Sequence, residues 1–349
     1  MRALEETLRQ IFPLDSTEEE TWRSRLAAET GKESVFAAAR FTARLAGIGR
    51  GPIHPHKPLL AVFTAGHGIA RKRTQPEVPP TEPARTKPSS AQTGVVPATV
   101  PVMPVQVLPV PTIPAFIVDM GGSDDFGQAS ANLMLVKNMR AEVTLLSRPV
   151  AASCADIARG PAMSIAMARE AVETGIALAE EWRRYDLFAI ACQGSHQGRG
   201  VLYAASAIAV RCLGDYQESD LPAGVEAALL TEILSAACDG KTGLELLAAV
   251  GGFDLGGAAG LMLALAARRQ PIVLADFAAT AAALLAARLE PFIRDYLFAV
   301  TAECPLHQAA LTLLGGPVGE PLPASGQSLE ESLATLIAAS SLFIEADRA

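Results

Sequence analysis

Short, uninterrupted apolar runs alternate along the chain with longer segments whose apolar residues recur every three or four positions. Four of these runs are predicted strands: "LLAVFT", "FIVDM", "DLFAIA" and "PIVLA". Each run contains a glycine or an aspartate or is followed by one within a few residues. Strands buried on both faces read as continuous apolar runs, so the pattern predicts an α/β fold with a Rossmann-like parallel sheet covered by helices on both faces. Ligands are then expected at the carboxyl ends of the strands.

The helical spacing predicts helices over residues 4–10, 18–29, 34–46, 161–183, 201–214, 225–237, 243–249, 256–267, 278–289, 307–314 and 328–344. Ser16 and Glu19 fit a capping box, and Pro161 suits the first turn of its helix. We expect the N-terminal helices and the last helix to pack together as a small helical subdomain.

A proline-rich tract interrupts this alternation, with eleven prolines between Thr74 and Pro114. Its polar first part, to about Gly94, is predicted to be a flexible linker. Its apolar second part favours an extended arm packed on its own domain over a partner-binding motif. The predicted divisions are a helical segment (1–50), a first strand and turn (51–73), the linker or arm (74–114), the α/β core (115–315) and a C-terminal loop and helix (316–349).

Composition narrows the class of protein. The 349 residues are half hydrophobic and carry a net charge of −8, which argues against a nucleic-acid binder because no basic face stands out. The most apolar stretch, 255–267, is too short to span a membrane, and the start of the chain lacks the apolar core of a signal peptide. The five scattered cysteines indicate reduced thiols in a cytoplasm and neither a disulfide framework nor a zinc site.

Two loops at strand ends hold the first chemical candidates. The stretch "GSHQGRG" (194–200) follows a strand and opens a helix, so its backbone N–H groups and Arg199 could hold a phosphate. A tight strand–helix turn is the equal alternative. His67, in "TAGHG", could be a general acid or base, although a structural histidine bonded to a carbonyl is favoured. His54 and His56 are interpreted as a solvated loop, with no metal site.

Acidic residues give the second set. Asp254, Asp276 and Glu303 follow or end apolar elements, and any of them could serve as a base in a strand-end cleft. Glu330 and Glu331 open the last predicted helix, where carboxylates stabilise the helix dipole, and that structural role is favoured for them. The glycine-rich stretch "VGGFDLGGAAG" (250–260) is expected to mark a loop that turns sharply or that something approaches closely, and its last part runs into the helix predicted from residue 256.

Several motifs resemble one family, in the same order along the chain. The block "VGGFDLGGAAGLMLALAARRQPIVLADF" is similar to the core of the nicotinate-nucleotide:dimethylbenzimidazole phosphoribosyltransferases. "DIARGPAMS" resembles the family's N-I-x-x-G-P-A-M-[ST], and "TAGHGI" its A-D-H-G-[VI]. "FIVDMGG" and "TAECPLHQAAL" resemble its V-D-x-G and S-x-E-x-G-H segments. The resemblance runs from about Ser34 to the C-terminus, apart from the proline-rich tract.

The resemblance implies a parallel α/β sheet with a smaller helical domain, a homodimer, and no cofactor. The implied reaction moves ribose phosphate from nicotinate mononucleotide to dimethylbenzimidazole, so the expected ligands are a nucleotide and a benzimidazole-type base. A base deprotonates the benzimidazole, while backbone amides and a lysine hold the phosphate. The segment with Gly251 and Gly252 is implied to line the nucleotide cleft.

The chain departs from the family at the implied site. In the family's phosphate loop, Ser195 replaces a glutamate, although Gly194, Gly198, Arg199 and Gly200 remain candidates. The family's P-P-G-S-L-G keeps only Ser34, and where the family has D-G-F this chain has Ala275-Asp276-Phe277, with Asp276 as the binding candidate. The implied phosphate lysine has no counterpart between Val225 and Ala237.

The family's base glutamate aligns with Gly326 or Gln327, and neither can accept the proton. Glu320, Glu330 and Glu303 are the substitute candidates. Two readings therefore stay open: an impaired or altered phosphoribosyltransferase, and a non-catalytic paralogue that binds a small molecule or associates with a true homologue.

Overall fold

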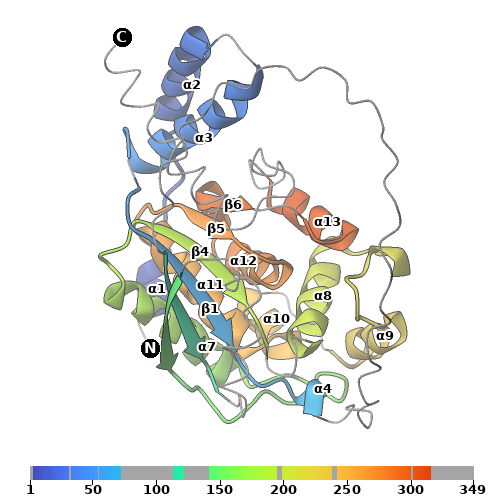
Figure 1. Cartoon of the computed structure of the whole chain (residues 1–349). Helices are drawn as coiled ribbons and strands as arrows, with labels where there is room; N and C mark the ends of the chain where they lie inside the picture. Colours follow the sequence, from blue (N-terminus) through green and yellow to red (C-terminus); the bar gives the residue numbers. More distant parts are fainter. Residues whose placement is uncertain are drawn as a thin grey trace, which may run out of the picture.

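Figure 1 shows a computed structural model of the chain, which describes residues 3–30, 33–53, 55–71, 113–121, 141–194, 199–237, 242–299 and 302–315. Six parallel strands form one sheet in the order β3-β2-β1-β4-β5-β6. They are β1 (Pro58–Thr64), β2 (Ile113–Asp119), β3 (Ala141–Ser147), β4 (Leu187–Cys192), β5 (Ile272–Leu274) and β6 (Leu297–Ala299). The four predicted strands are thus confirmed as β1, β2, β4 and β5, lying side by side in the middle of the sheet.

Sequence patterning missed the two edge strands. β3, "AEVTLLS", mixes polar and apolar residues because an edge strand is only partly covered. β6 has only three residues and follows a turn of 3-10 helix. Pro114, predicted to end the proline-rich tract, belongs to β2, which begins at Ile113. The predicted linker and arm, residues 74–112, lie outside the described residues.

The helices occupy most of their predicted ranges. They are α1 (Ala3–Leu8), α2 (Ser16–Thr30), α3 (Glu33–Gly49), α4 (Gly68–Arg71), α7 (Ile165–Glu181), α8 (Arg199–Leu213), α9 (Ala227–Ala236), α10 (Gly243–Val250), α11 (Phe253–Ala267), α12 (Phe277–Leu289) and α13 (Pro305–Leu314), with 3-10 helices η1 (Glu218–Asp220) and η2 (Pro291–Tyr296). The predicted last helix, 328–344, lies outside the described residues. No helix in the described part of the chain is both long and apolar enough to cross a membrane.

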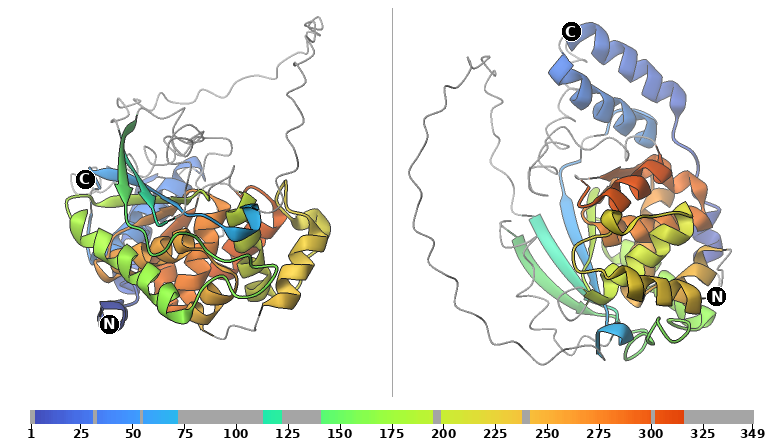
Figure 2. Two further views of the ribbon diagram at one scale, coloured as in Figure 1. Left: turned by 90° about the horizontal axis from the view of Figure 1, so that it is seen from below. Right: turned by 90° about the vertical axis from the view of Figure 1, so that its right-hand side faces the viewer.

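Helices contact both faces of the sheet, as predicted. On one face Phe63 of β1 packs under α11, and Phe116 of β2 packs against Trp182, just after α7, with ring centroids 5.1 Å apart. The right-hand view of Figure 2 shows this layer of helices beside the sheet. On the opposite face, Phe298 of β6 packs against Phe41 of α3 with ring centroids 5.5 Å apart.

Most of "VGGFDLGGAAG" is helix and not loop: α11 begins at Phe253, three residues before the helix predicted from residue 256. Only Gly251 and Gly252 connect α10 to α11, and Gly256, Gly257 and Gly260 lie inside α11. A Cβ atom on Gly260 would overlap the carbonyl oxygen of Val172 in α7. The glycines are therefore explained by the close approach of α7 to α11, which leaves no space for side chains between their backbones.

Two helices begin elsewhere than predicted because other residues cap them. Asp15 Oδ1 accepts hydrogen bonds from the N–H groups of Thr17 and Glu18, each 3.1 Å long, so Asp15 caps α2 and the predicted capping box from Ser16 is wrong. Helix α7 begins at Ile165, where the Ser164 hydroxyl accepts from the N–H of Met167. Pro161 therefore precedes the helix and does not start it.

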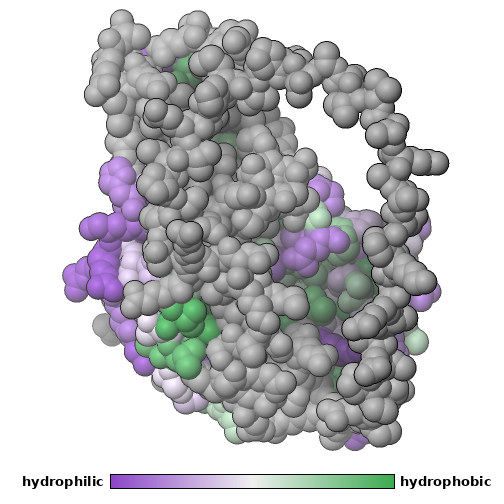
Figure 3. Space-filling view, viewed as in Figure 1, coloured by the Kyte–Doolittle hydropathy of each residue, from purple (hydrophilic) through white to green (hydrophobic). Residues whose placement is uncertain are grey.

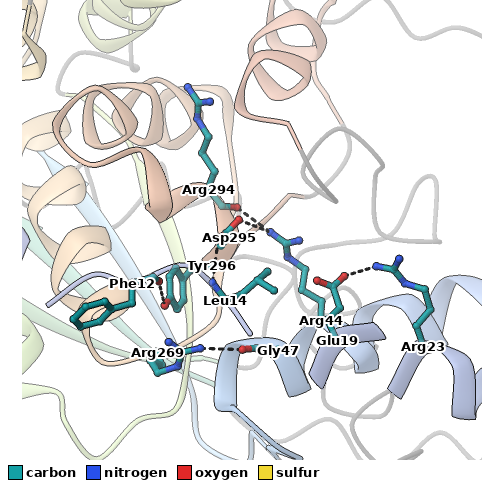
Figure 4. A network of polar contacts seen from close by, with 10 residues as sticks. All are labelled: Phe12, Leu14, Glu19, Arg23, Arg44, Gly47, Arg269, Arg294, Asp295 and Tyr296. Atoms are coloured by element: carbon teal, nitrogen blue, oxygen red, sulfur yellow. Dashed lines mark hydrogen bonds and ion pairs between the residues drawn. The ribbon is translucent and has the colours of Figure 1, made fainter. Parts of the chain in front are cut away.

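The N-terminal segment is tied to the core by a network of polar contacts shown in Figure 4. Arg269, just after α11, donates to the Gly47 carbonyl over 2.9 Å, and the Tyr296 hydroxyl donates to the Phe12 carbonyl over 2.6 Å. Arg44 of α3 donates to the Arg294 carbonyl. Helix α1 packs on α7 and α11 of the core. The C-terminal half of the predicted helical subdomain lies outside the described residues.

Candidate functional site at the carboxyl ends of the strands

The strand order contains a topological switch point between β1 and β4. From β1 the chain builds outward through β2 to β3, and from β4 it builds in the other direction to β5 and β6. In open parallel sheets such a point leaves a crevice at the carboxyl ends of the two strands, where ligands bind. His67 follows β1 there, and Gly194 follows β4, so the two predicted strand-end loops lie on either side of the switch point.

His67 is paired with an acid in the protein interior. Its side chain is 1 % exposed and its Nε2 lies 3.0 Å from Oδ2 of Asp254, which is fully buried. Asp254 Oδ1 also accepts from the N–H of Leu255 over 2.9 Å. The structure therefore favours the structural histidine over an exposed acid or base, with a carboxylate as its partner and not the carbonyl that we expected.

Three glycines make room for the His67 ring. A Cβ atom on Gly200 would overlap Cβ of His67, and one on Gly252 would overlap both the ring and Asp254 Oδ1. A Cβ atom on Gly194 would lie 3.2 Å from the ring. The glycines at the two ends of "GSHQGRG" thus have a packing reason, which gives weight to the tight-turn interpretation of that loop. Arg199, the first residue of α8, is exposed.

Asp276 and Glu303 are brought together at the N-terminus of α12. Asp276 Oδ1 accepts from the N–H of Ala279 over 2.6 Å, and its Oδ2 accepts from the N–H of Cys192 over 3.0 Å. Glu303 Oε1 accepts from the N–H of Phe277 over 3.2 Å. The two acids therefore already occupy the N–H groups of Phe277 and Ala279, two of the first three that a phosphate could use at this helix end.

Burial controls the protonation of this acid pair. Burial raises the pKa of Asp276 to about 8, with the nearby charges of Glu303 and Asp254 adding to the rise and the two N–H groups opposing it. Burial of its carboxyl group also raises the pKa of Glu303, although the residue is exposed at its surface edge. At neutral pH, Asp276 is thus mainly protonated, and Glu303 is the better placed of the two to accept a proton.

His307 supports the acid pair and was missed from the sequence as a functional residue. Its Nδ1 accepts from the N–H of Glu303 over 3.0 Å, so its Nε2 carries the proton and donates to Thr280 Oγ1 over 2.9 Å. Thr280 in turn donates to the Asp276 carbonyl. Burial lowers the pKa of His307 to about 4, which keeps the ring neutral. Its signal in the sequence is its position four residues after Glu303.

Two buried thiols lie near the acids. Burial raises the pKa of Cys154 to about 12 and raises that of Cys192 as well. Thiols held protonated in this way are poor nucleophiles and poor metal ligands. The cysteines of the described residues form no disulfide, and no group of three or more His, Cys, Asp or Glu side chains in this part of the chain could hold a metal ion.

The other predicted site residues have no demonstrated role in the site. Gly251 is buried beside Gly252 in the connection between α10 and α11. Ser34 lies near the start of α3, and its side chain is outside the described part. Ser195, Gly198, Glu320 and Glu330 lie outside the described residues, so their predicted roles stay predictions.

Comparison with known proteins identifies relatives of this chain. A family model described as "Phosphoribosyltransferase" matches residues 13–343. The nicotinate-nucleotide–dimethylbenzimidazole phosphoribosyltransferase of Roseiflexus sp. is 30% identical over 90% of this chain and 86% of its own length. That of Desulfotalea psychrophila is 36% identical over about half of each chain, 52% of this one and 50% of the relative.

A solved structure supports the fold. The crystal structure of the Thermus thermophilus enzyme of the same name superposes with a TM-score of 0.67, covering 95% of this chain and 96% of that one at 22% identity. At this level of identity, the likeness concerns the arrangement of strands and helices.

Proposed function

Because the chain belongs to the nicotinate-nucleotide–dimethylbenzimidazole phosphoribosyltransferase family, we propose that it transfers phosphoribose from a nicotinate mononucleotide-type donor to a benzimidazole-type base, at a much reduced rate. The ring nitrogen of the acceptor attacks C1′ of the ribose, and the bond from C1′ to the nicotinate nitrogen breaks. The electron pair leaves with nicotinate, and the N–H proton of the acceptor passes to a carboxylate.

The observation that carries this proposal is the acid pair beside the switch point. Glu303 is exposed at its edge and is held by one N–H group, so its second carboxylate oxygen can reach a proton donor. Asp276 beside it is mainly protonated at neutral pH and adds no full second charge. Glu303 is therefore our candidate for the base that replaces the family's missing glutamate.

The reduced rate follows from the residues that are lost. Gly326 or Gln327 stands where the base is expected, and Ser195 replaces a glutamate of the phosphate loop. A positioned general base typically contributes about 10²–10⁴-fold. A base that sits in a different place and remains engaged with the helix N-terminus would recover only part of that factor.

A second function rests on a different observation. The carboxylates of Asp254, Asp276 and Glu303 all have structural partners: His67 for the first and backbone N–H groups for the other two. A site whose acids are all engaged in this way would suit a paralogue that binds the ligand without turning it over. Such a protein could act as a homodimer or associate with a true homologue.

The test is an assay of free nicotinate. Pure protein is incubated with nicotinate mononucleotide and dimethylbenzimidazole, and nicotinate release is followed by chromatography. The proposal predicts slow release that Glu303→Gln abolishes, because the amide oxygen still accepts from Phe277 but takes no proton. The matched control is Glu181→Gln, which changes an exposed acid on α7 that binds Arg148. No release, together with calorimetric binding of the mononucleotide, favours the non-catalytic reading.

A further inference from the structure

Three neighbouring strands each end in a polar residue, and these three side chains lie in a row on the sheet face opposite α11. Thr64, Asp119 and Ser147 are the last residues of β1, β2 and β3, and the strand register pairs them with one another. Paired residues of adjacent strands share a face of the sheet. Phe63, the preceding residue of β1, faces α11, so Thr64 and its two neighbours face the other way.

The row opens to solvent toward the β3 edge. Thr64 is 1 % exposed, Asp119 is partly buried and Ser147 is exposed. On the same face of β3, Val143 and Leu145 are 42% and 45% exposed. Figure 3 shows an apolar patch on this side of the molecule, where Val143 and Leu145 of β3 are exposed. A small molecule that enters from this edge would meet apolar side chains first and the polar row at the carboxyl end of the strands.

The Thr64 hydroxyl is buried and has no hydrogen-bond partner among the residues that the structure describes. A buried hydroxyl without a partner destabilises the folded protein, so its presence at a strand end calls for an explanation. Asp119 beside it uses Oδ1 to accept from the N–H of Gly121 over 2.9 Å. Its other oxygen, Oδ2, has the chemistry to accept a second, charge-assisted hydrogen bond.

We propose that Asp119 and Thr64 bind the vicinal hydroxyl groups of a ribose. Asp119 Oδ2 accepts from one hydroxyl of the sugar, and Thr64 Oγ1 exchanges a hydrogen bond with the other. Doubly wound sheets with this strand order commonly bind a ribose hydroxyl through an acidic residue close to the nucleotide crevice. Asp119 ends β2, beside the strand that borders the switch point. The inference rests on the proposed function for the nature of the donor and adds the residues that would recognise its sugar.

The decisive variant is Thr64→Val, which keeps the shape of the side chain and removes the hydroxyl. Because the hydroxyl has no partner in the free protein, we expect Thr64→Val to raise the melting temperature. In calorimetric titrations it should weaken the binding of ribose 5-phosphate and of nicotinate mononucleotide by about 5- to 10-fold, the usual effect of one hydrogen bond. Asp119→Asn should weaken both by at least as much and should not discriminate against the 2′-deoxy or 3′-deoxy sugar phosphates.

Ser206→Ala is the matched control. Ser206 in α8 is fully buried, and its hydroxyl also has no partner in the described part of the chain, but it lies in the middle of a helix and not at a strand end. Its replacement should raise the melting temperature and leave both affinities unchanged.

The outcomes separate this inference from the proposed function. Binding of ribose 5-phosphate that depends on Thr64 and Asp119, without nicotinate release, supports the ribose site and contradicts the transferase. The ribose site is overturned if the Thr64→Val variant is less stable than the unmodified protein. It is also overturned if the variant binds ribose 5-phosphate and nicotinate mononucleotide as tightly as the unmodified protein does. It is overturned as well if neither sugar phosphate binds the unmodified protein.

Discussion

Gly260 of α11 lies so close to Val172 of α7 that a Cβ atom on the glycine would overlap the valine carbonyl oxygen. The same contact is made in reverse by Gly175 of α7, whose Cβ would overlap the Gly257 carbonyl oxygen. The two helices therefore meet backbone to backbone. This contact sets the distance between α7 and α11, whose first turn carries Asp254.

Gly260→Ala should destabilise the protein by about 1–3 kcal/mol or more, because backbone atoms on both helices must move to admit the methyl group. Urea denaturation measures the loss. Gly214→Ala is the control: its Cβ meets nothing within 4 Å, although its φ of +97° adds backbone strain. A Gly260→Ala variant that unfolds at the same urea concentration as the unmodified protein would contradict the helix contact.

Removing one member of the His67–Asp254 pair should cost more than removing both. His67→Leu leaves a fully buried carboxylate without its partner, a change that typically costs about 3–5 kcal/mol. The double variant His67→Leu with Asp254→Leu has no buried charge and should recover much of that loss. Unfolding free energies of the two variants check this, and a double variant less stable than the single one would contradict it.

His307 should make the protein less stable in acid. Its folded-state pKa of about 4 lies below the ordinary value of 6.5, so between these values the unfolded chain binds more protons than the folded one. Stability therefore falls as the pH falls from about 6.5 to about 4. His307→Gln should flatten this part of the curve of unfolding free energy against pH. An unchanged acid slope in the variant would show that the ring already titrates normally.

Asp276 should act in the opposite direction and over a higher range of pH. Its folded-state pKa of about 8 lies above the ordinary value of 3.8, so the folded protein holds a proton that the unfolded chain has released. Stability should fall as the pH rises from about 4 to about 8. The effect of His307 ends near pH 6.5, so the range from about 6.5 to about 8 separates the contribution of Asp276 from that of His307.

Asp276→Asn should remove that slope. The variant also replaces the carboxylate oxygen that accepts from the N–H of Cys192, which changes its stability at every pH. The comparison therefore uses the slope of unfolding free energy against pH and not its absolute value. The same slope in the variant and the unmodified protein would contradict a raised pKa.

The central strands of the sheet were predicted correctly because strands buried on both faces appear in a sequence as continuous apolar runs. The runs that became β1 and β4 are apolar at every position, and their burial on both faces is the reason. β3 left no such trace, since Val143 and Leu145 lie on an exposed edge. The start of α11 was predicted as part of a glycine-rich loop. Glycine required by close packing between helices looks the same in a sequence as glycine required by a turn.

The candidate site was only partly predictable. Position after a predicted strand pointed to His67 and Asp276, and both lie at the carboxyl end of the sheet. Glu303 was a candidate only because it follows an apolar element and matches the S-x-E motif, since the strand before it, β6, was not predicted. Sequence spacing could not pair His67 with Asp254, or Asp276 with Glu303, because these residues meet only when α11 and α12 pack on the sheet. The orphan hydroxyl of Thr64 has no sequence signal at all, since an unmet hydrogen bond is a property of the folded protein.

The most direct test of the central claim is the pH dependence of kcat/KM for nicotinate release from nicotinate mononucleotide and dimethylbenzimidazole. If Glu303 is the base, the rate of the unmodified protein rises with pH as this carboxyl ionises. The inflection then lies above the ordinary glutamate value of 4.5, because burial raises its pKa. Glu303→Gln loses both the rate and the inflection, whereas Glu181→Gln keeps them. Measurable turnover that survives in Glu303→Gln with the same pH profile would contradict the account, because it would place the base elsewhere in the chain.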